Sequence, residues 1–405
     1  MSYKFDHLIL AYGSNLNQHD WGKFCKRYGY PVDILQFEEM VKIPDYKLVF
    51  DWYSSSRKGG AANIKRAVGH YVEAVLFSTN DQGIKALREK EGHPYAYLET
   101  EVIALKNDGS EVEAKTYIVP QSTQRKYERP TREYYEICKE GYEAYDLCTK
   151  NLVLAASGEE PTPLCSLFTY GTLMRGEERH ELIVKGDYPR WNIDFALTAS
   201  VRGKLSTNGR FPGLDQRSED HTQGDYFCFS NISEVLAITD KIEGFSEFGS
   251  NSNLFRRTLT QVNTGGFEEE LAWVYVYEKN LGCEIVSNDW RVHNRSKLHF
   301  YWALIETYGQ YDPTFFGRLD ERRTSPSGDT DKTYYGGLEQ NLCLGRLSER
   351  DLASASGFYS AWPKESWFSC SEQKKNYEDK FFKQLDTTLP HFEFSDPSKD
   401  VFGTP

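Results

Sequence analysis

The apolar and polar residues of this chain follow a layout that occurs twice. In each copy a short apolar run comes first, at residues 8–11 and again at 167–169, and such a run predicts a buried strand. Tyr-Gly then ends the run, at Tyr12–Gly13 and at Tyr170–Gly171. Because glycine permits a sharp turn and a close approach of a ligand to the backbone, both positions are candidates for binding loops.

A helical pattern that ends in Glu-Gly is the second recurring feature. Residues 80–92 begin with capping side chains and end at Glu91 before glycine, and residues 233–244 begin with Ser-Glu and end at Glu243 before glycine. Glycine is a common stop signal for a helix, whereas a carboxylate there opposes the helix dipole. The two features recur in the same order at nearly the same separation, which indicates an internal duplication.

The remaining pattern predicts further strands in both copies and one long helix. Apolar residues alternate or cluster in the way of strands at residues 46–52, 71–78, 97–105 and 113–119, and in the second copy at 195–205, 224–229, 255–262 and 269–278. Residues 54–63 are rich in Ser and Gly and predict a loop. From Thr131 to Val153 the apolar spacing fits one helix face, with Pro130 placed where a helix start tolerates proline.

These patterns divide the chain into four parts. Residues 1–155 form the first copy, 156–163 a linker rich in Gly, Glu and Pro, and 164–295 the second copy. Residues 296–405 match neither copy. This last region is aromatic and rich in turn residues, which fits either an appended packing or dimerising segment, and with it a homodimer, or a cap over a substrate.

Composition limits the classes of function. The chain has 405 residues, with 39% hydrophobic and 27% charged, which predicts a soluble globule of two or three domains. A net charge of −12 disfavours a nucleic-acid partner and an anionic membrane surface. No run is long and apolar enough to cross a bilayer. The first residues lack the layout of a secretion signal, so we expect a cytoplasmic protein.

The sequence offers no pattern for a metal or a cofactor. The eight cysteines are scattered without Cys-x-x-Cys, so we interpret them as reduced thiols that mostly pack. A metal site needs clustered His and Cys, and a nucleotide site needs a phosphate loop or a dinucleotide fingerprint. We therefore expect no metal and no cofactor.

The repeated residues suggest chemistry, although each also has an ordinary structural interpretation. Several N–H groups that point into one concavity after a strand can hold a negative or carbonyl oxygen. A Tyr-Gly after a strand is nonetheless more often a plain turn, and a glutamate before a terminal glycine is normally solvated. Tyr12 and Tyr170 are core aromatics at least as often as ligand contacts. Arg175 either pairs with a surface carboxylate or holds a substrate carboxylate bidentately.

Several short motifs resemble those of the γ-glutamylcyclotransferase-like family, also called the AIG2-like family. In the first copy the matching stretches are residues 12–16 (Tyr-Gly-Ser-Asn-Leu), 46–50, 59–64, Glu91–Gly92 and 130–134. The second copy is similar to the branch of γ-glutamylamine cyclotransferases and of an antibiotic-pathway enzyme that removes a γ-glutamyl group. Its matching stretches are residues 170–176, 201–205, 210–214, 243–245, 255–257 and 289–291.

The resemblance implies an α+β fold, with two tandem small mixed β-barrels and flanking helices. It also implies that a single glutamate in each copy, Glu91 and Glu243, is the catalytic acid–base. The substrate-binding residues it implies are Tyr12, Gly13, Ser14, Asn15 and Leu16 in the first copy, and Tyr170, Gly171, Thr172, Leu173 and Arg175 in the second. The second copy departs from the family at Ser206–Thr207, where many relatives have Tyr-Asp, and at Phe255, where Tyr is common.

The implied reaction is an intramolecular transamidation of a small γ-glutamyl substrate. The α-amine attacks the γ-carbonyl, 5-oxoproline forms and the attached amine leaves, without a metal, ATP or a redox cofactor. Two alternatives stay open at this point. One or both copies could be a non-catalytic ligand-binding or scaffolding module, or the scaffold could hydrolyse the amide to glutamate.

Overall fold

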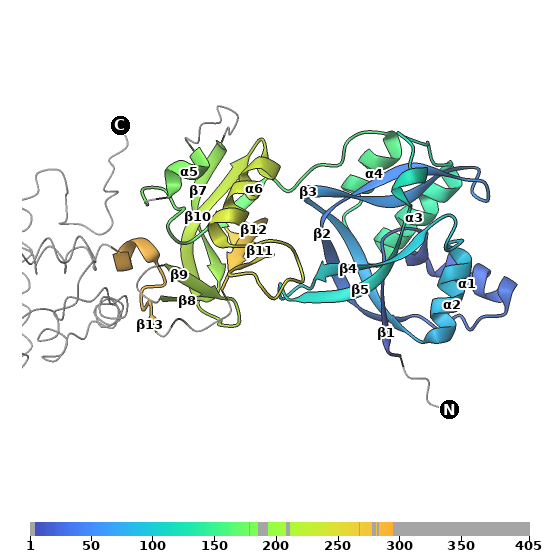
Figure 1. Ribbon diagram of the computed structural model, residues 1–405, viewed down its shortest axis with the longest axis horizontal. Coiled ribbons are helices and arrows are strands. Elements are labelled where there is room, and N and C mark those ends of the chain that lie inside the picture. The colour runs from blue at the N-terminus through green and yellow to red at the C-terminus, as the bar shows by residue number, and fades with distance from the viewer. Residues whose placement is uncertain are drawn as a thin grey trace, which may run out of the picture.

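A computed structural model describes residues 5–177, 179–184, 193–207, 211–266, 268–277, 281 and 283–294 of the chain. Two closed five-stranded β-barrels lie side by side, the first in blue and cyan and the second in green and yellow (Figure 1). Each barrel mixes one parallel pair with antiparallel pairs, as the resemblance implied. The region after residue 295, with its predicted packing or capping role, lies outside the described residues.

The first barrel is closed by the strand order β1-β3-β2-β4-β5. Its single parallel contact pairs Ile9 of β1 with Lys115 of β5. Its elements are β1 (His7–Ala11), the 3₁₀ turn η1 (Ser14–Leu16), α1 (Gln18–Tyr28), β2 (Gln36–Ser54), β3 (Gly59–Thr79), α2 (Asp81–Lys90), β4 (Leu98–Leu105), β5 (Glu111–Ile118), η2 (Gln121–Thr123), α3 (Arg132–Ala144) and α4 (Lys150–Ser157).

The second barrel repeats the plan with the order β10-β6-β12-β11-β7, and a separate small sheet β13-β8-β9 lies beside it. Here Leu167 of β6 and Trp273 of β12 make the parallel contact. Its elements are β6 (Ser166–Thr169), α5 (His180–Val184), β7 (Ile193–Arg202), β8 (Lys204–Thr207), β9 (Pro212–Asp215), β10 (His221–Phe229), α6 (Ile232–Glu243), β11 (Arg256–Asn263), β12 (Glu270–Val276) and β13 (Cys283–Glu284).

Two local predictions were wrong. The helix expected over 131–153 is broken into α3 and α4, because the chain reverses at Tyr145–Thr149, where Asp146 has φ 54°. The loop expected over 54–63 is shorter, since β3 already begins at Gly59. A Cβ on Gly60 would lie 1.8 Å from the Glu128 carbonyl oxygen, so glycine serves close backbone packing there.

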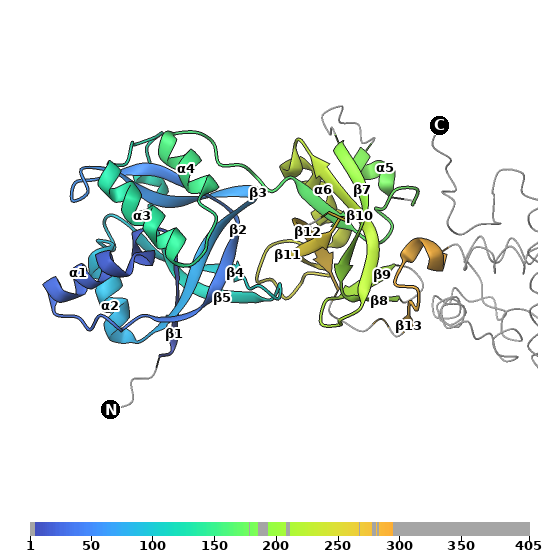
Figure 2. The same cartoon turned by 180° about the vertical axis from the view of Figure 1, so that it is seen from behind.

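The two barrels meet along β3, the β4–β5 turn and the α6–β11 side of the second barrel, as the view from behind shows (Figure 2). The Leu164 N–H donates to the Gly69 carbonyl over 2.9 Å, which fixes the start of the second copy against β3. The Thr258 hydroxyl donates to the Gly109 carbonyl over 2.8 Å at the β4–β5 turn. The two barrels are therefore joined by hydrogen bonds as well as by the linker.

Helices of the described residues include none with both the length and the apolar character needed to span a membrane. Five of the cysteines are reduced thiols: Cys25, Cys138, Cys148, Cys165 and Cys228. Within the described part of the chain no three or more His, Cys, Asp or Glu side chains are grouped as metal ligands would be.

Candidate active sites

The first site lies where the loop after β1 meets the end of α2. Helix α2 is capped by Asn80, whose side chain accepts the Gly83 N–H over 3.1 Å, and Glu91 terminates it. Gly92 follows with φ 63°, a left-handed conformation that favours glycine. Burial and packing of Ile84 and Leu87 hold α2 on the barrel, so the position of the Glu91 carboxyl is set by the helix rather than by a free loop.

A small pocket of about 30 Å³ brings the predicted residues of the first copy together. The Glu91 side chain shares this pocket with Tyr12, Gly13, Ser14 and Asn15. The rest of the wall was not predicted as part of the site, and consists of Tyr97, Tyr117, Tyr134, Thr116, Leu10, Ala11 and Ala62. Tyr134 does belong to the 130–134 stretch that carried the family resemblance, so a signal for it was present.

Leu16 lies outside this group. Its side chain is fully buried and packs against Gly141 of α3, where a Cβ would come within 2.7 Å of it. Its N–H donates to the Gly13 carbonyl over 3.0 Å. Both groups thus have partners inside the protein, and Leu16 anchors the loop. The turn begins at Ser14, so the amides of Ser14 and Asn15 are in the position that a helix start leaves without an internal acceptor.

A polar clamp orients the Glu91 carboxyl. The Asn15 amide donates to Glu91 Oε1 over 2.7 Å, and the Asn15 oxygen accepts from Lys90 Nζ over 2.8 Å. Lys90 also pairs with Asp20 at 3.0 Å, and Arg57 holds the same carboxylate bidentately at 3.0 and 2.7 Å. Burial raises the pKa of Glu91, and the Lys90 charge and the Asn15 hydrogen bond oppose that rise.

The tyrosines around this pocket are locked by hydrogen bonds. Tyr12 donates its hydroxyl to the Tyr117 carbonyl, and Tyr97 donates to the Ala62 carbonyl over 2.7 Å. Burial, with the Glu91 charge as a second cause, raises the pKa of Tyr12 well above its ordinary value. These phenols are consequently neutral and rigid, and Glu91, with its raised pKa, is the carboxyl that the pocket offers for proton transfer.

The second site has the same parts in the same order. Glu243 ends α6, and Gly244 follows with φ 63°. The Tyr170 hydroxyl donates to the Tyr275 carbonyl over 2.6 Å, and the pKa of Tyr170 is raised well above its ordinary value by burial and then by the charge of Glu243. The charge of Glu243 therefore acts on Tyr170 as that of Glu91 acts on Tyr12.

The electrostatic surroundings of Glu243 differ. Burial raises its pKa to about 7, with Arg179 as the opposing charge. Leu173, which is buried, stands where the first copy has Asn15. Within the part of the chain that the structure describes, no hydrogen bond to the Glu243 carboxyl corresponds to the one that Asn15 gives Glu91.

Arg175, another predicted residue of the second loop, is bonded to the barrel strands. Arg175 donates through Nη2 to Asp225 at 2.8 Å and to the Thr198 hydroxyl at 3.0 Å, while its backbone N–H also donates to Asp225 at 2.7 Å. Asp225 is fully buried and also pairs with Arg291 at 3.3 Å. The expected surface partner of Arg175 is thus a buried carboxylate, and the arginine fixes the loop.

Gly171 and Thr172 complete the second loop. A Cβ on Gly171 would lie 2.8 Å from Pro212, so the two loops approach too closely for any side chain there. The Thr172 carbonyl accepts the Arg179 N–H over 2.9 Å, which returns the chain toward the site. Asp225, Asp240, Arg257 and Tyr275 were not predicted as site residues, although Arg257 lies in one of the matching motifs.

Fold and sites together define a tandem pair of mixed barrels, each with one helix-terminal glutamate opposite a Tyr-Gly loop. The family model described as "Gamma-glutamyl cyclotransferase, AIG2-like" matches residues 9–136 and, again, 167–292. The chain therefore belongs to this family, and the family match recurs as the repeated motifs predicted.

Individual relatives are similar to smaller parts of the chain than the family model is. The γ-L-glutamyl-butirosin B γ-glutamyl cyclotransferase of Niallia circulans is 32% identical over 127 residues, which are 31% of this chain and 75% of that protein. A solved γ-glutamyl cyclotransferase shares 24% identity over 38% of this chain and 89% of its own, with a TM-score of 0.32. An AIG2-like protein from mouse (Mus musculus) shares 18% identity over 28% and 76%, with a TM-score of 0.22.

Proposed function

We propose that this chain converts γ-glutamyl amides into 5-oxoproline and a free amine or amino acid, with Glu91 and Glu243 as the acid–base groups of two sites. One observation carries the proposal. The Glu91 carboxyl, with a raised pKa, shares a small pocket with the Tyr12–Asn15 loop. The family of the chain and the activity in the name of the Niallia circulans relative support the same reaction class.

The reaction needs one proton to move twice. The substrate's α-amine nitrogen attacks the γ-carbonyl carbon and passes a proton to the glutamate. The glutamate then gives that proton to the leaving nitrogen as the γ-amide bond breaks, and the five-membered lactam remains. A carboxyl with a raised pKa suits both steps, and general acid–base catalysis contributes about 10²–10⁴-fold.

The loop and the tyrosines supply geometry rather than charge. The amides of Ser14 and Asn15 are placed to donate to the γ-carbonyl oxygen as negative charge develops on it. The pocket volume of about 30 Å³ has room for only the reacting end of the substrate. Holding the amine near the carbonyl makes the largest contribution, since well-oriented intramolecular reactions gain about 7–11 kcal/mol.

In the second site Tyr170, Gly171, Thr172 and Leu173 take the equivalent places. Arg175 is left out of the substrate-binding set, because its guanidinium bonds to Asp225. We assign it to loop positioning. The apolar Leu173 in place of Asn15 makes the second site the more hydrophobic, so a γ-glutamylalkylamine is the substrate we expect it to prefer.

The test uses the full chain and four variants. Purified protein is incubated with a γ-glutamyl dipeptide and with γ-glutamylbutylamine, and 5-oxoproline is quantified by mass spectrometry. We expect Glu91→Gln to lower the activity of the first site and Glu243→Gln that of the second, each by about 10²–10⁴-fold, because a neutral amide cannot carry the proton. The exposed neighbours Glu89→Gln and Glu247→Gln serve as matched controls and should stay within twofold.

Each other outcome points to a different protein. Free glutamate in place of the lactam would assign an amide hydrolase to the same scaffold. No product from any γ-glutamyl compound, with binding retained, would assign a ligand-binding or scaffolding module. Loss of activity in the Glu89→Gln control as well would place the chemistry elsewhere on α2.

A further inference from the structure

An arginine of the second barrel is buried where the two barrels touch. Arg257 of β11 is 1% exposed. Its guanidinium pairs with Asp240 of α6 at 2.9 Å and with Asp45, which belongs to the first barrel. The rings of Phe245, Phe248 and Trp273 lie 4.8, 5.1 and 5.2 Å from the guanidinium carbon. The cation is thus enclosed by aromatic rings and by carboxylates from both copies.

Asp45 is built to reach across the junction. It lies at the irregularity of β2 between Pro44 and Tyr46, and its φ of 57° is left-handed, which is uncommon for a residue other than glycine. Its Oδ1 accepts the Gly69 N–H over 3.0 Å, so its own barrel fixes one carboxylate oxygen. The other oxygen, Oδ2, accepts from Arg257. A strained backbone that aims a side chain at a partner often has a functional role.

Arg257 in turn holds the end of α6 that carries Glu243. Asp240 lies one helical turn before Glu243, and its carbonyl accepts the Phe245 N–H over 2.8 Å. The Phe245 ring packs on Arg257, so the guanidinium contacts α6 on one side of Glu243 and the chain just after it on the other. Among the described residues, the carboxylates that pair with Arg257 are Asp45 and Asp240, and not Glu243.

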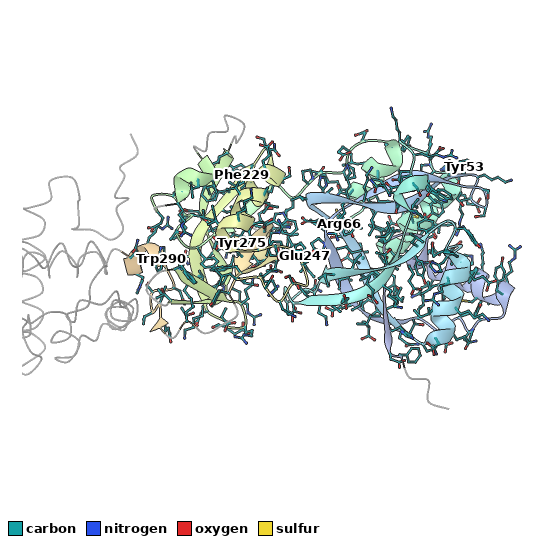
Figure 3. The ribbon with its side chains drawn as sticks, in the orientation of Figure 1. Tyr53, Arg66, Phe229, Glu247, Tyr275 and Trp290 are labelled. Atoms are coloured by element: carbon teal, nitrogen blue, oxygen red, sulfur yellow. The ribbon has the colours of Figure 1, made fainter. Side chains whose placement is uncertain are left out.

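The opposite wall of the second site reaches the same cluster. The Tyr275 hydroxyl donates to Asp240 over 2.6 Å, and the Tyr275 carbonyl accepts the Tyr170 hydroxyl over 2.6 Å. Figure 3 shows Tyr275 inside the second barrel, with Arg66 and Glu247 on the facing sides of the junction. The Tyr170 loop and the α6 terminus are therefore joined through Tyr275 and Asp240, and Asp240 in turn pairs with Arg257.

We propose that Asp45 of the first barrel is a positioning residue of the second active site: through Arg257 it holds the last turn of α6 so that the Glu243 carboxyl stays opposite the Tyr170 loop. This rests on the proposed function of the second site. Close packing supports it, because a Cβ on Gly69 would lie 2.8 Å from Ile232 at the start of α6. The first barrel thus contacts α6 at its first turn and, through Arg257, near its last.

The test replaces Asp45 in a full chain whose first site is silenced by Glu91→Gln. Asp45→Asn removes the charge but keeps an oxygen for the Gly69 N–H, so the first barrel should fold normally. We expect kcat/KM of the second site to fall about tenfold or more, mainly in kcat, and Asp45→Glu to restore part of it. The first site, assayed in a Glu243→Gln chain, should not respond.

The matched control is another contact across the same junction. Glu111 accepts the Gly249 N–H over 2.9 Å, whereas the carboxylates that pair with Arg257 are Asp45 and Asp240. Glu111→Gln should stay within twofold in both assays. If Glu111→Gln lowers the second activity as much as Asp45→Asn does, general docking explains the effect and the proposal is overturned.

A second measurement separates this proposal from the proposed function. In protein with ¹³C-labelled glutamate, the Glu243 carboxyl should titrate near pH 7, facing Tyr170 and Arg179. Asp45→Asn should lower that midpoint as water reaches the carboxyl, and Glu111→Gln should not. An unchanged midpoint overturns the positioning role whether or not the chain makes 5-oxoproline. Absence of lactam together with a lowered midpoint would reject the catalytic proposal alone.

Discussion

Glu91 and Glu243 occupy equivalent places in two copies of one fold, yet their surroundings differ. Glu91 has a hydrogen bond from Asn15, with Lys90 adjacent in the sequence. At the corresponding positions the second copy has Leu173 and Ile242, which offer no donor. Burial is the leading cause of the raised pKa of both carboxyls, and for Glu243 it reaches about 7. The comparison teaches that burial at this place in the fold raises the pKa of both carboxyls, whereas the groups that oppose the rise differ between the copies.

The loops that face these carboxyls are also held differently. In the first copy Asn17 caps α1 by accepting the N–H groups of His19 and Asp20, each at 3.0 Å. In the second copy the loop is tied to the barrel wall by the Arg175–Asp225 pair. Asp225 pairs with Thr169 in the strand register, and the equivalent of Asp225 beside Ala11 is Val75. One loop is thus anchored by a helix cap and the other by a buried charge.

The largest effect should follow from breaking that buried charge. Asp225→Ala leaves Arg175 and Arg291 without their carboxylate, and removing one partner of a buried pair costs about 3–5 kcal/mol. We expect the second barrel to lose that much unfolding free energy in a urea titration. The Asp215→Ala change, which affects an exposed pair with Arg217, is the control and should cost less than about 1 kcal/mol. Equal effects of the two substitutions would contradict a special role for Asp225.

A smaller effect concerns stability and pH. The folded chain binds the Glu243 proton more tightly than the unfolded chain does, since the pKa rises from 4.5 to about 7. Stability is therefore lost as pH rises between these values, and above pH 7 the carboxylate costs on the order of 3 kcal/mol. Glu243→Gln should stabilise the protein most at pH 8 and hardly at pH 4. A benefit that is independent of pH would refute a raised pKa at this position.

The smallest effect should come from making the first site resemble the second. Asn15→Leu removes the hydrogen bond that opposes the rise in the Glu91 pKa. The acid limb of the first activity, measured in a Glu243→Gln chain, should shift to higher pH, because the base must lose its proton at a higher pH. On the acid limb we expect a loss of about tenfold at a fixed pH, consistent with a hydrogen bond to a charged group. A shift to lower pH would show that Asn15 does not stabilise the ionised form.

Much of the fold could be predicted from local pattern. The repeated strand, the Tyr-Gly turn and the Glu-Gly helix end are each encoded within about a dozen residues, and α2 and α6 end where the glycines indicated. The break between α3 and α4 could not be predicted, because the apolar spacing continues through it. It depends on a left-handed Asp146 that no local signal demands.

Contacts between distant segments set the remaining features of the sites. Asp45 and Arg257 are 212 positions apart, and Arg175 and Asp225 are 50 apart. Nothing near Arg175 in the sequence distinguishes a partner inside the barrel from one on the surface. Lys90 was overlooked as a site residue although it is adjacent to Glu91, because its role depends on the loop that folds over it.

Gly69 has no Cβ, which would collide with Ile232. Helix α6 of the second copy can therefore pack closely against β3 of the first copy. The residues that orient Glu91 all belong to the first copy. Helix α6, which carries Glu243 of the second copy, instead packs against β3 of the first copy. Cutting the chain at the linker should therefore yield unequal halves: an amino-terminal piece that remains self-sufficient, and a carboxy-terminal piece whose active-site helix has lost its neighbour. In the tandem chain the first copy thus serves as part of the structural support of the second active site.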